Sequence, residues 1–316
     1  IDRSSRPSSG QSRIRGGAFW GNVLSGRLPL NFFSANPFLA SSRRLTNTSF
    51  STYHALEMEV RKRFSDGFTV QGNYTFGKAL SDYDGDSSVL TNDTKASSVQ
   101  NSRYSVRQIM PRHLFKANWI YELPFGDGKQ FGSANGVLGK LMSGWQFGGI
   151  INWRSGRPLS IVSGIGTFHR ASISDDNTVN LSQAQSASDI RNLTGRQDIG
   201  GNTFWLDPCL SFDTGATCSD AGSTQGLFIL PNSGELGELS QTPIYGPRRF
   251  KFDFNLSKRT KITEDMNVEF RWEVFNALNN VNFCTPNTNI LSSSFGRTNC
   301  TITNPRLMQF ALKLNF

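Results

Sequence analysis

Few residues of this chain have the types and spacing that chemistry requires. The acidic run 82–86 resembles the start of a calcium loop, but Ser87 stands where such a loop needs glycine. No histidine has a cysteine or a carboxylate at the spacing of a metal site or a catalytic pair. We therefore expect no catalytic residue, no metal ion and no cofactor, and we interpret the acidic run as a solvated loop. The histidines concerned are His54, His113 and His169.

The four cysteines form two local couples, Cys209 with Cys218 and Cys284 with Cys300. Both couples lie in sequence rich in Thr, Asn, Ser and Gly, which is typical of loops. Neither couple has the CxxC spacing of a zinc site, and no histidine lies near either one. We predict two local disulfides formed in an oxidising compartment, because short loops lose the least entropy on closure. The alternative is two pairs of free thiols.

The composition excludes several classes of protein. Apolar residues make up 37% of the chain, yet aromatic residues reach 12%, and disordered chains are poor in aromatic residues. No stretch approaches the roughly 18 consecutive apolar residues of a membrane-spanning helix. The net charge of +9 comes from scattered basic residues, so we expect no nucleic-acid partner. Because the chain starts at Ile1 with no signal region, we expect a processed or truncated product.

Alternation of apolar and polar residues is the strongest pattern in the chain, and it is typical of strands with two different faces. Each alternating segment is about ten residues long, which is the length that a tilted strand needs to cross a bilayer. Aromatic residues stand at segment ends, as in the pairs Phe68 and Phe76 or Trp145 and Trp153, where interfacial girdles would lie. The segments are 53–64, 68–76, 113–123, 145–154, 250–257, 266–274 and 308–316.

The two faces of these segments differ in what they can contact. A charge at the bilayer midplane costs about 2–4 kcal/mol on the lipid face of a barrel, so charged positions should line a wet interior. A soluble sandwich, which would bury the aromatic face against a second sheet, is the alternative. We expect lipid contact at Phe250, Phe252, Phe254, Val268, Phe270, Trp272, Phe310, Leu312 and Leu314. We expect water contact at Lys251, Asp253, Glu269, Arg271, Glu273 and Lys313.

Short and long connections alternate between the segments, and the connection from Pro124 to Ser143 fits this alternation least. Outer-membrane barrels have short periplasmic turns and long extracellular loops. We therefore predict an all-β fold, an antiparallel transmembrane β-barrel segment of the cell outer membrane. The C-terminus at Phe316 would be periplasmic, and both cysteine couples would lie in extracellular loops. Residues 1–50 would be a loop-rich lead-in, and residues 157–247 a long extracellular loop.

Several motifs resemble the late-barrel region of TonB-dependent outer-membrane receptors, in the group that carries a carboxypeptidase-regulatory-like domain. The resemblance runs from Leu30 to Phe316 and omits the central loop 160–245. The motifs are Tyr53-His54-Ala55-Leu56, Arg63-Phe64-Ser65-Asp66-Gly67, Asn73-Tyr74-Thr75-Phe76-Gly77-Lys78-Ala79, Pro111-Arg112-His113, Tyr121-Glu122-Leu123-Pro124-Phe125-Gly126, Gly144-Trp145-Gln146, Ser155-Gly156-Arg157-Pro158, Phe270-Arg271-Trp272-Glu273-Val274-Phe275-Asn276 and Asn282-Phe283.

The resemblance implies the late strands of a large barrel, of about 22 strands in such transporters, from the C-terminal third of a receptor. The plug domain and the TonB-binding segment of the family are absent from this chain. The implied partners are outer-membrane lipid and lipopolysaccharide, an unidentified ligand, and the TonB system through the missing N-terminal regions. The chain end also resembles the signal read by the barrel-insertion machinery, at Met308, Phe310, Leu312, Leu314 and Phe316.

The implied function is ligand uptake across the outer membrane, energised through TonB and without enzymatic activity. The alternative is a structural or adhesive β-protein of the outer membrane or cell exterior, whose loops bind surface partners while no solute passes. A plug domain encoded upstream would favour transport.

Overall fold

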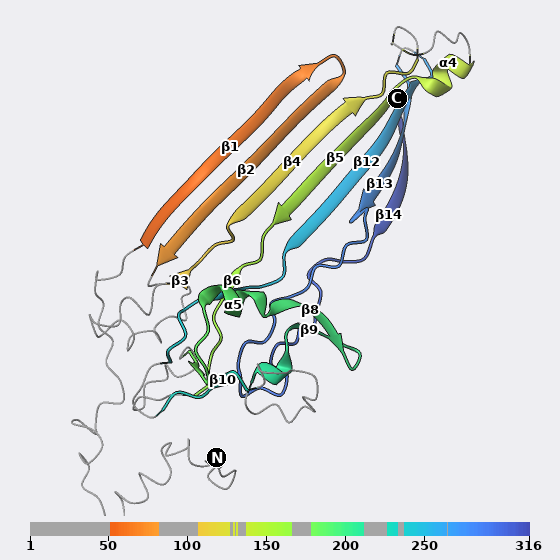
Figure 1. Ribbon diagram of the computed structural model, residues 1–316. Helices are drawn as coiled ribbons and strands as arrows, with labels where there is room; N and C mark the ends of the chain where they lie inside the picture. The colour runs from red at the N-terminus through yellow and green to blue at the C-terminus, as the bar shows by residue number, and fades with distance from the viewer. Residues whose placement is uncertain are drawn as a thin grey trace, which may run out of the picture.

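One antiparallel sheet of eight strands dominates the fold (Figure 1). The computed structural model describes residues 51–81, 107–126, 129, 131, 137–165, 178–211, 226–232, 237–263 and 265–316. No helix within these ranges is long and apolar enough to cross a membrane. Four features considered above lie outside the described residues, namely the lead-in 1–50, the acidic run 82–86, His169 and Cys218.

All seven alternating segments are strands, so the predicted all-β antiparallel fold is confirmed. Each long strand pairs with its neighbours in the order β1-β2-β4-β5-β12-β13-β14, and the short β3 pairs with the end of β2. Five of the long strands exceed nine residues, well above the five or six of a typical strand. The bounds are β1 (Ser51–Ser65), β2 (Phe68–Ser81), β3 (Arg107–Gln108), β4 (His113–Glu122), β5 (Trp145–Arg154), β12 (Arg249–Lys261), β13 (Asn267–Phe275) and β14 (Leu307–Asn315).

The two ends of the sheet carry different connections. At the short-turn end, β1 turns into β2 through Asp66-Gly67, and both residues have the positive φ that a two-residue hairpin turn requires. The β12–β13 turn lies at the same end, as does the longer β4–β5 connection with its helix α4 (Val137–Met142). The β14 strand also ends there, at the end of the sheet that carries α4 (Figure 1). The predicted alternation of short and long connections is therefore present, and the connection 124–143 contains a helix.

The opposite end of the sheet carries a folded loop cap, which we define as the described residues of 155–248 and 276–306. Residues 157–247 were expected only as a loop, but the structure shows short elements within them. Five of them are two or three residues long, which is too short for a periodic sequence pattern, and the other three are five or six residues long. The elements are β6 (Pro158–Leu159), β7 (Asn180–Leu181), α5 (Ala187–Asn192), β8 (Thr194–Ile199), β9 (Asn202–Leu206), η4 (Pro208–Leu210), β10 (Phe228–Ile229) and β11 (Ile244–Tyr245).

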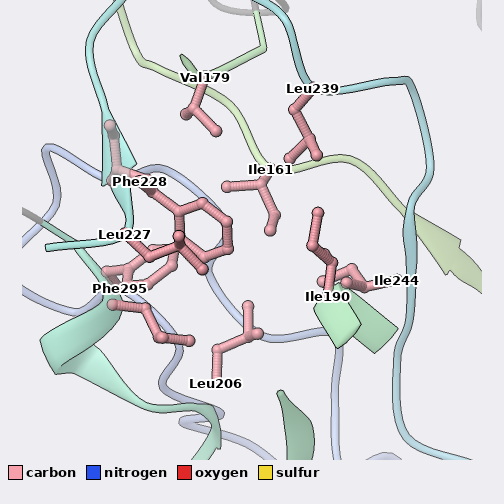
Figure 2. Close-up of a cluster of buried hydrophobic side chains, with 11 residues drawn as sticks. Ile161, Val179, Ile190, Leu206, Leu227, Phe228, Leu239, Ile244 and Phe295 are labelled. Atoms are coloured by element: carbon pink, nitrogen blue, oxygen red, sulfur yellow. The ribbon is translucent and has the colours of Figure 1, made fainter. Parts of the chain in front are cut away.

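The loop cap has its own hydrophobic core (Figure 2). Phe228 and Phe295 pack edge to face with their ring centroids 6.2 Å apart, and neither is exposed to solvent. These two rings come from the β5–β12 and β13–β14 connections, so the core joins two loops that are distant in sequence. The core residues are Ile161, Val179, Ile190, Leu206, Leu210, Leu227, Phe228, Leu239, Ile244, Ile290 and Phe295.

Hydrogen bonds hold the cap together and connect it to the sheet. The amide of Trp205 donates to the carbonyl of Gly296 over 2.7 Å, which joins the two loops. The hydroxyl of Tyr245 donates to the Gln108 side chain over 3.0 Å, which joins the cap to β3. The cap is therefore a packed structure at the loop end of the sheet.

Candidate functional site

The strand register divides the long strands into one apolar and one polar face. Residues paired directly across antiparallel strands point to the same side of a sheet. In one apolar row, Phe252 pairs with Ile151, which pairs with Ala117. In the neighbouring polar row, Lys251 pairs with Asn152, which pairs with Lys116. The same division continues through all seven long strands, and the lysines that fall in the apolar rows, Lys62, Lys78 and Lys258, lie toward the strand ends.

Aromatic rings form a connected surface on the apolar face. The indole of Trp119 stacks on Phe252 with ring centroids 5.9 Å apart, and Trp272 stacks on Phe310 at 6.0 Å. Phe254 joins these two pairs, because its ring centroid lies 6.0 Å from that of Phe252 and it packs edge to face on Trp272 at 5.5 Å. On β14 the apolar side chains are largely exposed, with Leu312 at 75%. The nine positions expected to contact lipid all lie on this face.

A glycine makes room for one of these rings. Gly149 pairs with Trp119 across β4 and β5. A Cβ atom added at Gly149 would collide with the six-membered ring of Trp119. The missing side chain therefore lets the indole lie flat over the β5 backbone.

The polar face carries charged side chains, most of which are paired in its short-turn half. Glu269 accepts from Arg259 and from Arg271 and is only 8% exposed at its side chain. Nearer the loop end, the Lys251 ammonium lies 2.7 Å from the Asp253 carboxylate. The six positions expected to contact water all lie on this face.

The short-turn end of the polar face contains a cavity of about 300 Å³. Its lining includes Glu122, Lys129, Gln146, Arg259 and Glu269. The Lys129 ammonium lies 3.0 Å from the Glu122 carboxylate at its rim. A cavity lined by such charged groups is suited to water and polar solutes.

An asparagine amide connects the sheet to the cap. Asn282 accepts from the backbone amide of Phe250 at 2.7 Å and donates to the carbonyl of Phe250 at 2.8 Å. The pairing of β12 with β13 reaches only Phe254, so the amide of Asn282 takes the place of a strand partner for Phe250. Asn276, with a φ of 50°, ends β13 in the left-handed conformation that asparagine tolerates well. Both asparagines belong to motifs quoted for the family resemblance, but their roles were not predicted.

One disulfide is visible within the cap. Cys284 and Cys300 are bonded with their Cα atoms 5.4 Å apart, as the sequence pairing proposed. Cys209 is also in a disulfide, and none of the described cysteines is free. The pairing of Cys209 with Cys218 stays a prediction, because Cys218 is outside the described residues. The bond between Cys284 and Cys300 ties the ends of the segment that supplies Ile290 and Phe295 to the cap core.

The other predicted residues are distributed along the strands. His113 lies on the apolar face, where its Nδ1 is 2.8 Å from the hydroxyl of Tyr74, while His54 lies on β1 opposite Lys78. Among the described residues, no three His, Cys, Asp or Glu side chains lie close enough together to hold a metal ion. The insertion-signal residues Met308, Phe310, Leu312 and Leu314 are exposed on β14, and Phe316 beyond it is 95% exposed.

A hairpin at the margin of the cap holds a charged carboxylate. Asp198 accepts from the Thr203 hydroxyl at 2.8 Å and from the Arg196 guanidinium at 2.9 Å. These two hydrogen bonds lower the pKa of Asp198 below its ordinary value. The resulting contribution to stability is present above the unfolded-state pKa and is lost as the pH falls through the folded-state pKa.

A sheet with an aromatic face, a charged face, and its longest connections at the end opposite the tight turns is the arrangement of an outer-membrane barrel wall. A family model described as an outer membrane beta barrel domain matches residues 20–309. The chain belongs to this family. No curated protein and no solved structure matches the chain.

Membership in the outer membrane beta barrel domain family decides which face meets lipid. In such a barrel the outward face is apolar and the interior is polar. The Phe252 face of the sheet is therefore the lipid face, and the Lys251 face lines the interior. The match includes residues 160–245, so the cap is part of the family's domain as well.

Proposed function

We propose that this barrel is part of an outer-membrane receptor that takes up a ligand, with energy supplied by the TonB system through regions outside this chain. The observation that carries the proposal is the polar face. Charged and amide side chains follow it from the short-turn end to the cap, so a solute inside the barrel would meet water and polar groups along the whole span. A polar interior is common to outer-membrane barrels, and here it supplies the polar route that uptake requires. We propose no catalytic step for it.

The motifs that resemble TonB-dependent receptors support the energy coupling. Some of them lie at turns and strand ends, as in Asp66-Gly67 between β1 and β2 and Gly156-Arg157-Pro158 after β5, and others lie within strands, as in the motif 73–79 of β2. In the proposed orientation, the cap is extracellular and covers the mouth of the barrel, while the C-terminus is periplasmic. The ligand would enter past the cap.

An adhesive role is the second candidate, and the packed cap favours it. Two loops joined by a shared core and by backbone hydrogen bonds present a fixed surface, which suits the binding of a surface partner. Adhesion would use only the outside of the cap and would leave the charged interior without a role. Uptake is therefore the function that accounts for both features.

Genetic epistasis tests the proposal. The host strain should be compared with strains that lack this protein, TonB or both, on panels of single carbon, iron and phosphorus sources. Uptake through TonB predicts a growth defect on one class of nutrient, equal in the single and the double deletion. Loss of surface attachment without any nutrient defect would reject uptake and support the adhesive role.

A further inference from the structure

The loop end of the polar face holds a cluster of arginines whose arrangement differs from that of the other charges. Arg154 at the end of β5 and Arg249 at the start of β12 are direct partners in the sheet register, so they point to the same side. Arg157 is three residues after Arg154, and its carbonyl accepts from the amide of Gly246, three residues before Arg249, so the three like charges lie near one another. We define Arg154, Arg157 and Arg249 as the arginine cluster.

No carboxylate neutralises the arginine cluster within the part of the chain that the structure describes. The nearest acidic group along β12 on the same face, Asp253, pairs with Lys251 at 2.7 Å and accepts from the Asn276 amide at 2.8 Å. On β4, the residue paired with Arg154 is Leu114, which brings no charge. In the short-turn half of the face, by contrast, Arg259 and Arg271 share Glu269.

The cluster is held in place by rigid backbone. Arg154 and Arg249 belong to paired strands, and the carbonyl of Arg157 accepts from the Gly246 amide at 2.8 Å. A Cβ atom on the neighbouring Gly156 would collide with the Gly246 carbonyl, so the two segments meet backbone to backbone. β6 then pairs with β11 through Pro158 and Tyr245. The backbone positions from which the three arginine side chains extend are therefore fixed.

Like charges placed opposite each other destabilise a sheet, so the cluster opposes folding unless an anion neutralises it. The planar guanidinium group binds carboxylate and phosphate groups through two parallel hydrogen bonds. A cleft lined by charges of one sign also concentrates ions of the opposite sign. Arg154 and Arg249 lie on the interior face of the sheet, away from lipid, and Arg157 lies at the start of the cap next to them.

We propose that the arginine cluster is a binding subsite for a carboxylate or phosphate group of a soluble anionic ligand. The subsite adds a ligand class to the proposed uptake function. It rests on that function in one respect, because it takes the polar face as the path of the ligand. A ligand that passes the cap would meet Arg154, Arg157 and Arg249 first. The ligand class is thus an anion small enough to enter the barrel, and phosphates of lipopolysaccharide, which lie in the lipid phase, are not its source.

Binding of citrate and of inorganic pyrophosphate to the purified full-length protein in neutral detergent tests this subsite. Calorimetric titration at low ionic strength should show saturable binding of at least one of the two anions, weakened by added salt. Arg154→Gln and Arg249→Gln should each weaken that binding about tenfold or more. Arg61→Gln, an exposed arginine of β1 on the same face outside the cluster, should leave it unchanged.

A second readout separates binding from a structural role. Loss of a repelled charge should leave the heat-modifiable folded form at least as stable as the wild type, and Arg154→Lys should keep part of the affinity. Absence of saturable binding to the wild type, an equal loss in Arg61→Gln, or binding of lipopolysaccharide alone would overturn the subsite. Uptake could still operate on an uncharged ligand in those cases, because the titration does not involve TonB.

Discussion

At the scale of single residues, the most informative side chain is Asn282. It is only 1% exposed, and its amide makes hydrogen bonds to the amide and carbonyl of Phe250 and to the Thr303 hydroxyl. A buried amide with all these partners stabilises one defined arrangement of the loop against the sheet. The hydrogen bonds of Asn282 thus link the β13–β14 connection to the first residues of β12.

We expect Asn282→Ala to lower the free energy of unfolding by about 1–3 kcal/mol, because the partly buried amide of Phe250 loses its acceptor. The temperature at which the barrel loses its heat-modifiable form on gels measures this change. Asn152→Ala is the matched control, because Asn152 is exposed on β5 and should tolerate the change. Equal midpoints for the two variants would contradict the role of Asn282.

The partners of Asn282 could not be predicted from the sequence. Phe250 lies 32 residues away in the sequence, and no motif or spacing at either residue indicates the contact. The register of β12, in contrast, follows from the alternation of Phe250, Phe252 and Phe254 with charged residues, since a slip of one residue would place the charges in lipid. The arginine cluster could not be predicted from the sequence either, because it depends on which residues of β5 and β12 are paired.

At the scale of elements, the sheet and the loop cap differ in what holds them. The sheet depends on backbone pairing and on contact between its apolar face and lipid. The cap depends on a core of its own, to which short elements and the irregular segments between them both contribute. Such segments leave no periodic pattern, so the sequence predicted the seven long strands but not the cap.

We expect Phe228→Ala to loosen the cap and leave the sheet intact. Removal of this ring from a fully buried site should destabilise the cap by about 3–5 kcal/mol. Limited proteolysis of the purified barrel should then cut within 155–248 faster than in the wild type, with unchanged heat modifiability. Ile199→Ala, which alters a partly exposed cap residue, serves as the control. Unaltered resistance in Phe228→Ala would show that the cap core does not stabilise the loops.

We expect the last strand to direct insertion into the outer membrane. β14 has a fully apolar outward face and is followed by Phe316, which is 95% exposed. Deletion of Phe316 should leave the protein in the periplasm, as measured by cell fractionation. Lys313→Gln, on the polar face of the same strand, should insert normally. Recovery of the variant that lacks Phe316 as a heat-modifiable barrel in the outer membrane would disprove the role of the last strand as an insertion signal.

At the scale of the whole molecule, the central feature is the separation of two faces along seven strands. Every strand contributes to both faces, so the arrangement follows from alternation and register together. The sequence carried the alternation, and the pairing of neighbours in chain order gave the register. The sequence could not show the packed cap. This cap covers the loop end of the charged face.

Spin labels on the two faces test this arrangement most directly. Labels would replace Phe252, Phe270 and Leu312 on one face, and Asp253, Arg271 and Lys313 on the other, in the protein reconstituted into bilayers. The first three labels should collide with oxygen dissolved in lipid, and the second three with a water-soluble nickel chelate. Labels at Phe252, Phe270 and Leu312 that reach neither probe would show that the aromatic face is packed against protein, and would contradict the assignment of this face to lipid.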